Sequence, residues 1–169
     1  MDKLTEFKDK YLSSLDLTIA IPFDNPIQFD DGISSISIYR DKEFQVEFII
    51  CQPNLTIPEH FHPNVDSYEV FLYGMSFTHS GEIIVSEKMA LAEDHKGMPF
   101  HYKETIRVKP TDWHGGKSSK KGGAFLSIQR WLNNVKPTHV GADWVGESMG
   151  KKHNKAIKEQ EWLMKERKN

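Results

Sequence analysis

The feature that constrains the fold most is a series of short segments in which apolar and polar residues alternate. The clearest is segment 44–50, FQVEFII, where every second residue from Phe44 to Ile50 is apolar. This period of two is typical of a β-strand with one buried face. Gly, Pro, Asn and Asp separate further strand candidates at 33–39, 68–73, 75–79, 82–86, 105–108 and 124–132. Short strands at this spacing predict an all-β sandwich or barrel.

The two ends of the chain have a different pattern. In segment 1–15, apolar residues recur at helical spacing among charged ones, which predicts an amphipathic helix packed against the body. Segment 154–167, NKAIKEQEWLMKER, predicts a C-terminal helix. We therefore divide the chain into an N-terminal helix with a lead-in strand (1–32), a barrel (33–136) and a C-terminal helical extension (137–169). Segment 115–123, GGKSSKKGG, has the composition of a flexible loop.

Charge and hydropathy exclude several classes of protein. The 169 residues include 22 Lys plus Arg and 24 Asp plus Glu, so the formal charge is −2, and no basic stripe indicates a nucleic-acid partner. No apolar run approaches the roughly 18 residues of a membrane span. The first residues lack the basic start and apolar run of a secretory signal, so we expect a cytoplasmic protein. Cys51 is the only cysteine, which excludes an intrachain disulfide and a multi-cysteine zinc site.

The residues that point to chemistry begin with two histidines in segment 58–74, PEHFHPNVDSYEVFLYG. His60 and His62 would share one face of a strand, so both imidazoles can approach a single cation. Glu69 follows on the next predicted strand, and His114, in segment 109–116 (KPTDWHGG), is a candidate for a third nitrogen ligand. Such a nitrogen and oxygen set suits iron(II), manganese, nickel or zinc, with coordination positions left for water or substrate.

Each of these residues also has a structural interpretation. His60 and His62 could be a surface pair beside a proline turn, Glu69 a salt-bridge partner at a strand edge, and His114 a side chain that caps a loop. His79 could line the same cavity, although a core or surface role is favoured. The other histidines, His95, His139 and His153, lie in polar surroundings and are expected to be solvated.

Candidate substrate-binding residues lie on the same predicted strands. Phe71 and Tyr73 are candidates for apolar walls of a pocket, and Gln129 is a candidate for orienting the substrate. Ser127 and Gln129 share a strand face with Phe125, so this face could line the barrel interior. In the alternative arrangement, which is slightly favoured, Ser127 and Gln129 face solvent while the intervening residues face the core.

At these residues the chain resembles the cupin superfamily, whose members are small barrels of the double-stranded β-helix, jelly-roll-like type. In that family a first motif contributes two histidines spaced as His60 and His62, then a glutamate, and closes with a glycine that matches Gly74. A second motif runs from a proline (here Pro110) through a glycine, replaced here by Asp112, to a third histidine, His114. The resemblance covers roughly residues 44–132.

The resemblance implies a metal centre made of His60, His62, His114 and a carboxylate. The family's glutamate usually falls at the position of Asp66 or Ser67, so the fourth ligand is either Glu69 or Asp66, or the site has three histidines alone. We expect one divalent ion, with iron(II) the first choice and zinc, nickel or manganese as alternatives. The resemblance favours an oxygenase acting on a small molecule, with an isomerase or lyase next. The alternative is a non-catalytic small-molecule-binding protein, and a homodimer is compatible with either function.

Overall fold

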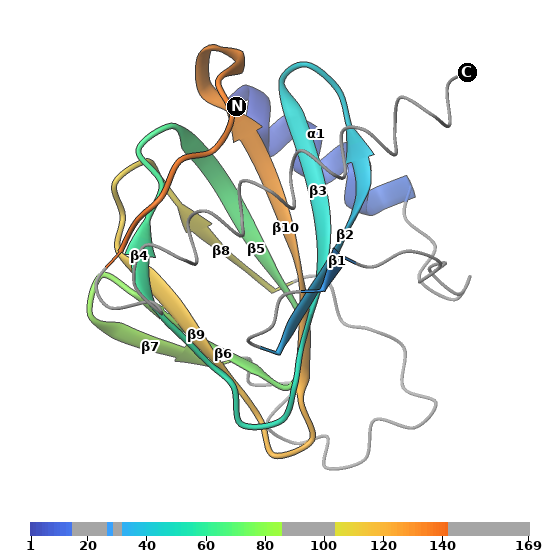
Figure 1. Cartoon of the computed structure of the whole chain (residues 1–169). Helices are drawn as coiled ribbons and strands as arrows, with labels where there is room; N and C mark the ends of the chain where they lie inside the picture. The colour runs from blue at the N-terminus through green and yellow to red at the C-terminus, as the bar shows by residue number, and fades with distance from the viewer. Residues whose placement is uncertain (15–26, 29–31, 86–103, 142–169) are drawn as a thin grey trace.

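Two antiparallel sheets face each other in the computed structural model, which describes residues 1–14, 27–28, 32–85 and 104–141 (Figure 1). One sheet has the strand order β1 (Ile27–Gln28), β2 (Ile33–Arg40), β3 (Phe44–Cys51), β10 (Gly123–Trp131), β5 (Val65–Tyr73) and β8 (Thr105–Val108). The other has the order β11 (Val140–Gly141), β4 (Thr56–Phe61), β9 (His114–Ser118), β6 (Met75–His79) and β7 (Glu82–Val85). All seven predicted strands are present, and the all-β expectation is confirmed. The predicted C-terminal helix lies outside the described residues.

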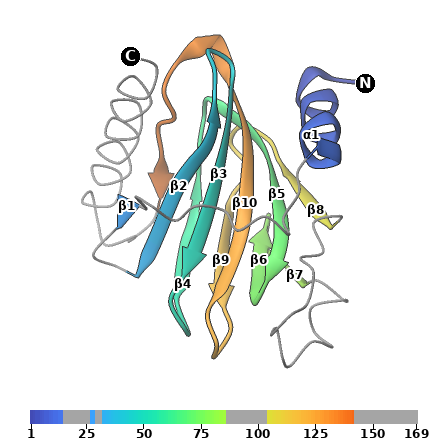
Figure 2. The same ribbon diagram turned by 90° about the vertical axis from the view of Figure 1, so that its right-hand side faces the viewer.

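The predicted N-terminal helix is confirmed as α1 (Lys3–Ser14), which lies against the outer face of the six-stranded sheet (Figure 2). Asp2 caps its first turn, because its Oδ1 accepts a hydrogen bond of 3.0 Å from the Thr5 backbone N–H. Leu4 is buried in the core cluster under the helix, and Phe7 and Tyr11 pack beside it. Among the described residues, no helix combines the length and apolar character that a membrane crossing requires.

The central strands of the six-stranded sheet are buried on both faces, and this corrects the expectation of one buried face for segment 44–50. Its apolar face, with Val46 and Phe48, lies in the cluster beneath α1. Its polar face is also buried, since Gln45 is only 1% and Glu47 only 4% exposed. The alternation therefore separates a helix-covered outer face from a polar inner face that is turned toward the second sheet.

Segment 115–123 is not the flexible loop that its composition predicted. It contains most of β9, a tight turn and the start of β10. The turn closes where the Ser119 hydroxyl donates to the Gly122 carbonyl at 2.7 Å. Because β9 pairs with β4 on one side and β6 on the other, its backbone hydrogen bonds are satisfied by the sheet whatever its side chains are. A Cβ at Gly115 would lie 2.5 Å from the Ile57 carbonyl oxygen, so the absence of a side chain permits this close pairing.

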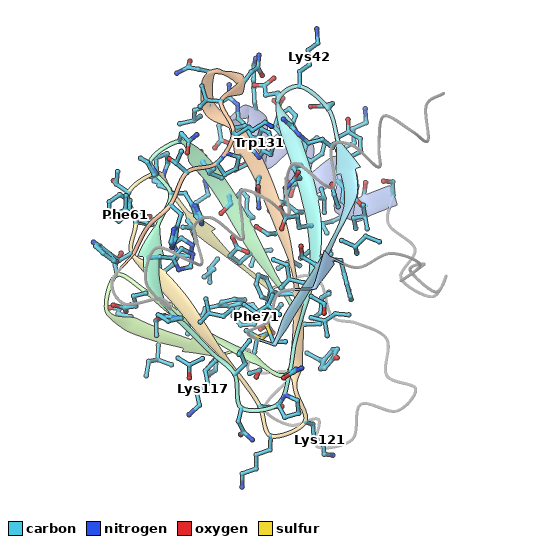
Figure 3. All side chains as sticks on the ribbon, viewed as in Figure 1. Lys42, Phe61, Phe71, Lys117, Lys121 and Trp131 are labelled. Carbon is cyan, nitrogen blue, oxygen red and sulfur yellow. The ribbon has the colours of Figure 1, made fainter. Side chains whose placement is uncertain are left out.

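The space between the sheets is filled at one end by apolar side chains (Figure 3). Phe71, Phe77 and Phe125 form an aromatic cluster there, with ring centroids 4.8 Å apart for Phe71 and Phe77 and 5.1 Å apart for Phe77 and Phe125. Edge-to-face contacts of this kind stabilise beyond the area they bury. The other end of the space is left for the polar residues described next.

Candidate metal centre

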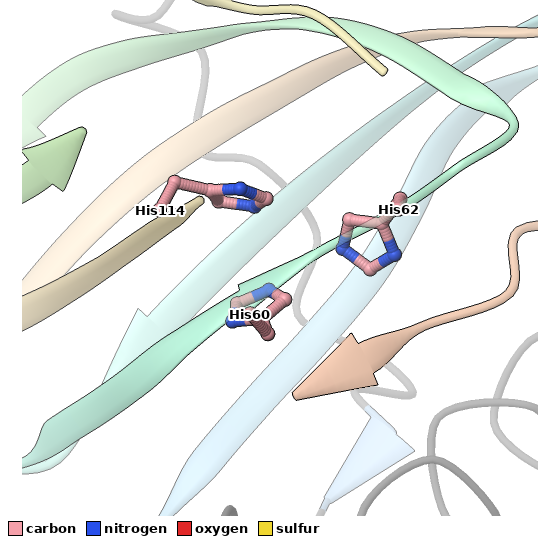
Figure 4. Close-up of side chains that lie close together, drawn as sticks. All are labelled: His60, His62 and His114. Atoms are coloured by element: carbon pink, nitrogen blue, oxygen red, sulfur yellow. The ribbon is translucent and has the colours of Figure 1, made fainter. Parts of the chain in front are cut away.

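Three histidines meet at the end of the five-stranded sheet (Figure 4). His60 lies on β4, His62 follows just after that strand, and His114 opens β9. His60 and His114 are direct partners in the antiparallel pairing of the two strands, so the backbone register itself brings them together. One ligand nitrogen from each of the three side chains lies within 4.8 Å of the other two.

Hydrogen bonds to the backbone fix the tautomer of each ring. In every case Nδ1 lies at hydrogen-bond distance from a carbonyl oxygen, which can only accept, so Nδ1 carries the proton. The acceptors are the carbonyl oxygens of Pro58, Thr138 and Asp112, at 2.8, 2.8 and 2.9 Å from His60, His62 and His114 respectively. Nε2 of each ring therefore carries the lone pair. Backbone carbonyls that hold a ring by its other nitrogen are typical of metal-binding histidines.

Electrostatics also favours neutral rings at this centre. Burial holds the pKa of His60 well below its usual 6.5, and the neighbouring His114 and His62 rings lower it further. Burial likewise lowers the pKa of His114. Since a metal binds the unprotonated imidazole, these shifts leave the donor atoms in the form that a cation needs at neutral pH. The chemistry of the donor set therefore fits a divalent metal ion.

A turn before β9 presents His114. The Asp112 carboxylate accepts a hydrogen bond of 3.0 Å from the Lys109 backbone N–H, and the Asp112 N–H donates to the Lys109 carbonyl at the same distance. His79 Nε2 lies 3.0 Å from the same carboxylate, so His79 braces this turn and does not line the cavity. Asp112, in the place of the motif glycine, is thus the residue that organises the turn.

The three histidines line a cavity of about 110 Å³ between the two sheets. One part of its wall is apolar and consists of Ile33, Ile49, Ile57, Phe77, Ile106 and Phe125. The remaining part is polar and includes Ser35, Glu47, Glu69, Ser127, Gln129 and His139 in addition to the three histidines. The five-stranded sheet thus supplies imidazoles, and the six-stranded sheet supplies carboxyl, hydroxyl and amide groups.

Two carboxyl groups are buried in the wall across from the histidines. Burial raises the pKa of Glu47 and of Glu69 to about 7 each, and the charge of Glu69 contributes to the shift at Glu47. Oε1 of Glu69 accepts hydrogen bonds from the hydroxyls of Ser67 at 2.9 Å and Ser127 at 3.1 Å. Gln45 donates from Nε2 to Glu47. Groups that titrate near neutral pH can both give and take a proton there.

Comparisons with known proteins agree with this architecture. The structure is similar to KdgF from Halomonas sp., with a TM-score of 0.53, 11% identity, and coverage of 67% of this chain and 92% of that one. It is also similar to an RmlC-like cupin from Shewanella frigidimarina, with a TM-score of 0.51, 13% identity, and coverage of 68% and 90%. The chain has the cupin fold. No protein-family profile matches the sequence, and no curated protein matches it significantly.

Of the ligands that the cupin motifs implied, the structure brings together His60, His62 and His114. Glu69 lines the same cavity, but its carboxylate is not part of the group of ligand atoms. The alternative prediction, in which Asp66 is the fourth ligand, is wrong. It lies on the opposite face of β5, where Arg107 donates from Nε at 2.7 Å and from Nη2 at 2.6 Å. Successive residues of a strand point to opposite faces, which separates Asp66 from the cavity.

Of the predicted substrate-binding residues, Gln129 lines the cavity of this cupin fold, whereas Phe71 and Tyr73 do not. Phe71 is buried in the aromatic cluster. Tyr73 packs on the cluster under α1, because an irregularity in the pairing of β10 with β5 shifts the register between the partners of Phe71 and Tyr73 and so changes the face. The favoured alternative, with Ser127 and Gln129 in solvent, is wrong, since both side chains are buried.

Sequence reasoning missed two titratable residues of the cavity wall. His139 was expected to be solvated, yet it lines the cavity, with its ring centroid 5.4 Å from that of His60. It lies in an irregular segment after β10, which Asn64 ties down by accepting from the Thr138 backbone N–H at 2.9 Å, and no sequence pattern predicts that position. Glu47 was assigned to an exposed strand face. The alternation in segment 44–50 shows only that the two faces differ, and Glu47 is turned inward because α1 covers the apolar face.

Proposed function

We propose that this chain is a metal-dependent enzyme that acts on a small molecule inside the barrel. His60, His62 and His114 would hold one divalent ion through their Nε2 atoms, with iron(II) the first choice and zinc, nickel or manganese as alternatives. The observation that carries the proposal is the set of three imidazoles, two buried and one half-buried, whose Nδ1 atoms are all held by backbone carbonyls. A merely structural histidine cluster has no need for three lone pairs directed at one cavity.

The chain's own residues suggest how the cavity is used. A divalent ion on three imidazoles keeps open coordination positions and supplies Lewis-acid polarisation or, as iron, dioxygen chemistry. The apolar wall excludes water from the reacting groups, and Gln129 is oriented by its hydrogen bonds to Ser127 and Trp131, each of 3.1 Å. An oxygenase is the first reaction class that we propose for this arrangement.

An isomerase or lyase is the second candidate, and a specific observation favours it. Both reactions move a proton on the substrate, and the cavity contains two carboxyl groups whose pKa burial raises to about 7. General acid and base catalysis is most efficient when the pKa of the group lies near the working pH. Glu69 would be the group that holds or accepts the proton, because its Oε2 is buried without a hydrogen-bond partner.

The test is the metal content of protein purified without chelator, measured by elemental mass spectrometry. We expect about one equivalent per chain, lost in a His60→Ala/His114→Ala double variant. The matched control is Glu59→Ala/Lys117→Ala, which changes one exposed residue on each of the same two strands, β4 and β9. No metal in the wild-type protein, and none taken up on reconstitution, would contradict the proposal.

The element that is found then directs the second experiment. Iron leads to oxygen-consumption assays, and zinc, nickel or manganese leads to assays of proton exchange from small carbonyl compounds into solvent. A bound metal without any exchangeable water ligand, measured by water relaxation on the manganese-substituted protein, would instead favour the non-catalytic binding protein.

A further inference from the structure

The polar part of the cavity wall is acidic and has no counter-charge from a basic residue. The titratable side chains that line the cavity are Glu47, Glu69, His60, His62, His114 and His139. Among the described lining residues there is no Lys or Arg. Pockets that bind phosphates or carboxylates use such cations, Arg above all, because the guanidinium matches the anion's geometry. The wall opposite the histidines therefore offers carboxyl groups, and no basic side chain among the described residues, to a ligand.

Glu69 presents an acceptor atom that the protein leaves for a ligand. The side chain is only 6% exposed, and its Oε1 already accepts from Ser67 and Ser127. Oε2 is buried with no hydrogen-bond partner. A buried acceptor without a donor costs free energy, so a ligand that brings a donor to Oε2 gains more than it would at a satisfied group.

Glu47 adds a second carboxyl group to the same wall. Glu47 on β3 and Glu69 on β5 are both direct cross-strand partners of Ser127 on the intervening strand β10. Their backbones are thus two strand spacings apart, about 10 Å, and their side chains project to the same face. The hydrogen-bond donors of this wall, from Ser67, Ser127 and Gln45, are all neutral. A single positive charge between Glu47 and Glu69 would offset negative charge that these neutral donors do not offset.

We propose that the cavity takes a small amphipathic amine, whose ammonium group binds Oε2 of Glu69 beside Glu47 and whose apolar body packs on the isoleucine and phenylalanine side chains of the wall. This inference rests on the proposed function for the location of the site. It names the substrate class of that site and does not depend on which metal is bound. An ammonium group supplies several donors and a full charge, and charge-assisted hydrogen bonds are the strongest of the hydrogen bonds available here.

The apolar wall sets the other half of the ligand. Ile49, Ile57 and Ile106 lie with Phe77 and Phe125 around a cavity of about 110 Å³, a size suited to one ring or a short branched chain. Benzylamine, benzyl alcohol and benzoate share one such ring and differ in the charge of the polar end. They are positive, neutral and negative at neutral pH, which makes them a matched set of probes.

The experiment is isothermal titration of the full chain, as purified, with these three compounds at pH 7. We expect benzylamine to bind at least about tenfold more tightly than benzyl alcohol or benzoate. Glu69→Gln should weaken benzylamine about tenfold and leave benzyl alcohol unchanged, and Glu47→Gln should weaken it less. Glu82→Gln, the same change at an exposed position on β7, is the control and should leave all three affinities unchanged.

Equal or tighter binding of benzoate, no binding of benzylamine, or unchanged benzylamine affinity in Glu69→Gln would each overturn the inference. The His60→Ala/His114→Ala variant separates the inference from the proposed function. If the amine binds through the carboxyl groups, this variant still binds benzylamine more tightly than benzyl alcohol or benzoate. An amine preference that disappears in this variant would mean that the amine was a metal ligand, which also overturns the inference. A protein without metal that still prefers benzylamine would contradict the proposed function alone.

Discussion

The two faces of the six-stranded sheet differ sharply although they alternate residue by residue on the same strands. The outer face carries Val46, Val70, Leu126 and Ile128, each fully buried in the cluster beneath α1. The inner face carries buried polar groups, listed along the strands as Gln45, Glu47, Ser67, Glu69, Ser127 and Gln129. One face stabilises the fold by burying apolar area, and the other holds the groups that give the cavity its chemistry.

The apolar core of this barrel is divided between the layer beneath α1 and one end of the space between the sheets. A sheet that faced solvent on its outer side would have to place its apolar residues inward, and the cavity would then be dry and closed. Because α1 covers the outer face, a large share of the apolar side chains of β3, β5 and β10, among them Val46, Val70 and Leu126, lies outside the barrel. The interior is thereby released for carboxyl and amide groups, which are hydrogen-bonded to one another and to serine hydroxyls except at Oε2 of Glu69.

Leu126→Ala is expected to have the largest effect and to break only the outer face. Leu126 is fully buried beneath α1, and truncating such a side chain costs about 3 kcal/mol of unfolding free energy or more. Urea unfolding monitored by circular dichroism measures the loss. The metal content and benzylamine affinity of the folded variant should match the wild type, because the adjacent Ser127 keeps its place on the inner face. A folded variant that has lost metal would show that the two faces are coupled.

Glu47→Gln tests the inner face through pH. Burial raises the pKa of Glu47 from 4.5 to about 7 in the folded chain. Between pH 4.5 and 7 the folded protein therefore binds more protons than the unfolded chain. The contribution of Glu47 to the free energy of unfolding is full below pH 4.5 and declines as the pH rises to about 7. The loss is on the order of 3 kcal/mol. The glutamine variant does not titrate, so its unfolding free energy should fall less than that of the wild type between pH 4.5 and 8.

The buried histidines change the free energy of unfolding with pH in the opposite direction to Glu47, so they must be separated from the effect of Glu47. The pKa of His60 is lowered in the folded chain, so its contribution to stability increases as the pH rises toward 6.5. This contribution is the same in the wild type and in Glu47→Gln, and it cancels in the difference between them. Identical pH profiles for the two proteins would contradict the burial of Glu47 as a titrating group.

Much of the fold could be predicted from the sequence because the signals were local. Strand alternation, turn residues and the helical spacing of Leu4, Phe7 and Tyr11 each predicted an element that the structure contains. His60 and His62 could be predicted because they are two residues apart, and His114 because segment 109–116 resembles the second cupin motif. In these cases the residues themselves carry the periodicity of the element.

The sequence-based predictions were wrong where a segment distant in the sequence but close in space determines the conformation or burial of a residue. The Gly-, Ser- and Lys-rich composition of segment 115–123 predicts a flexible loop, but its conformation is set by the strands on either side of β9. Tyr73 is a candidate for an apolar wall of the pocket in the sequence, but a register shift in the pairing of β5 with β10 turns it to the outer face. The burial of Glu47 depends on α1, which lies far away in the sequence. A period of two shows that the faces differ and leaves open which face is turned inward.

Ser127→Ala is the smallest change and the sharpest comparison, because Ser127 is next to Leu126 and points to the other face. Its hydroxyl donates to Glu69 Oε1 and accepts from Gln129 Nε2, each at 3.1 Å. Losing these bonds should cost only about 1 kcal/mol of unfolding free energy. Ser127 helps to hold down the pKa of Glu69, so the variant should have a still higher pKa there and bind benzylamine several-fold more weakly at pH 7. The deficit should shrink at pH 8.5, where the carboxyl is ionised in both proteins. A variant with wild-type affinity at pH 7 would show that the hydroxyl does not tune this carboxyl.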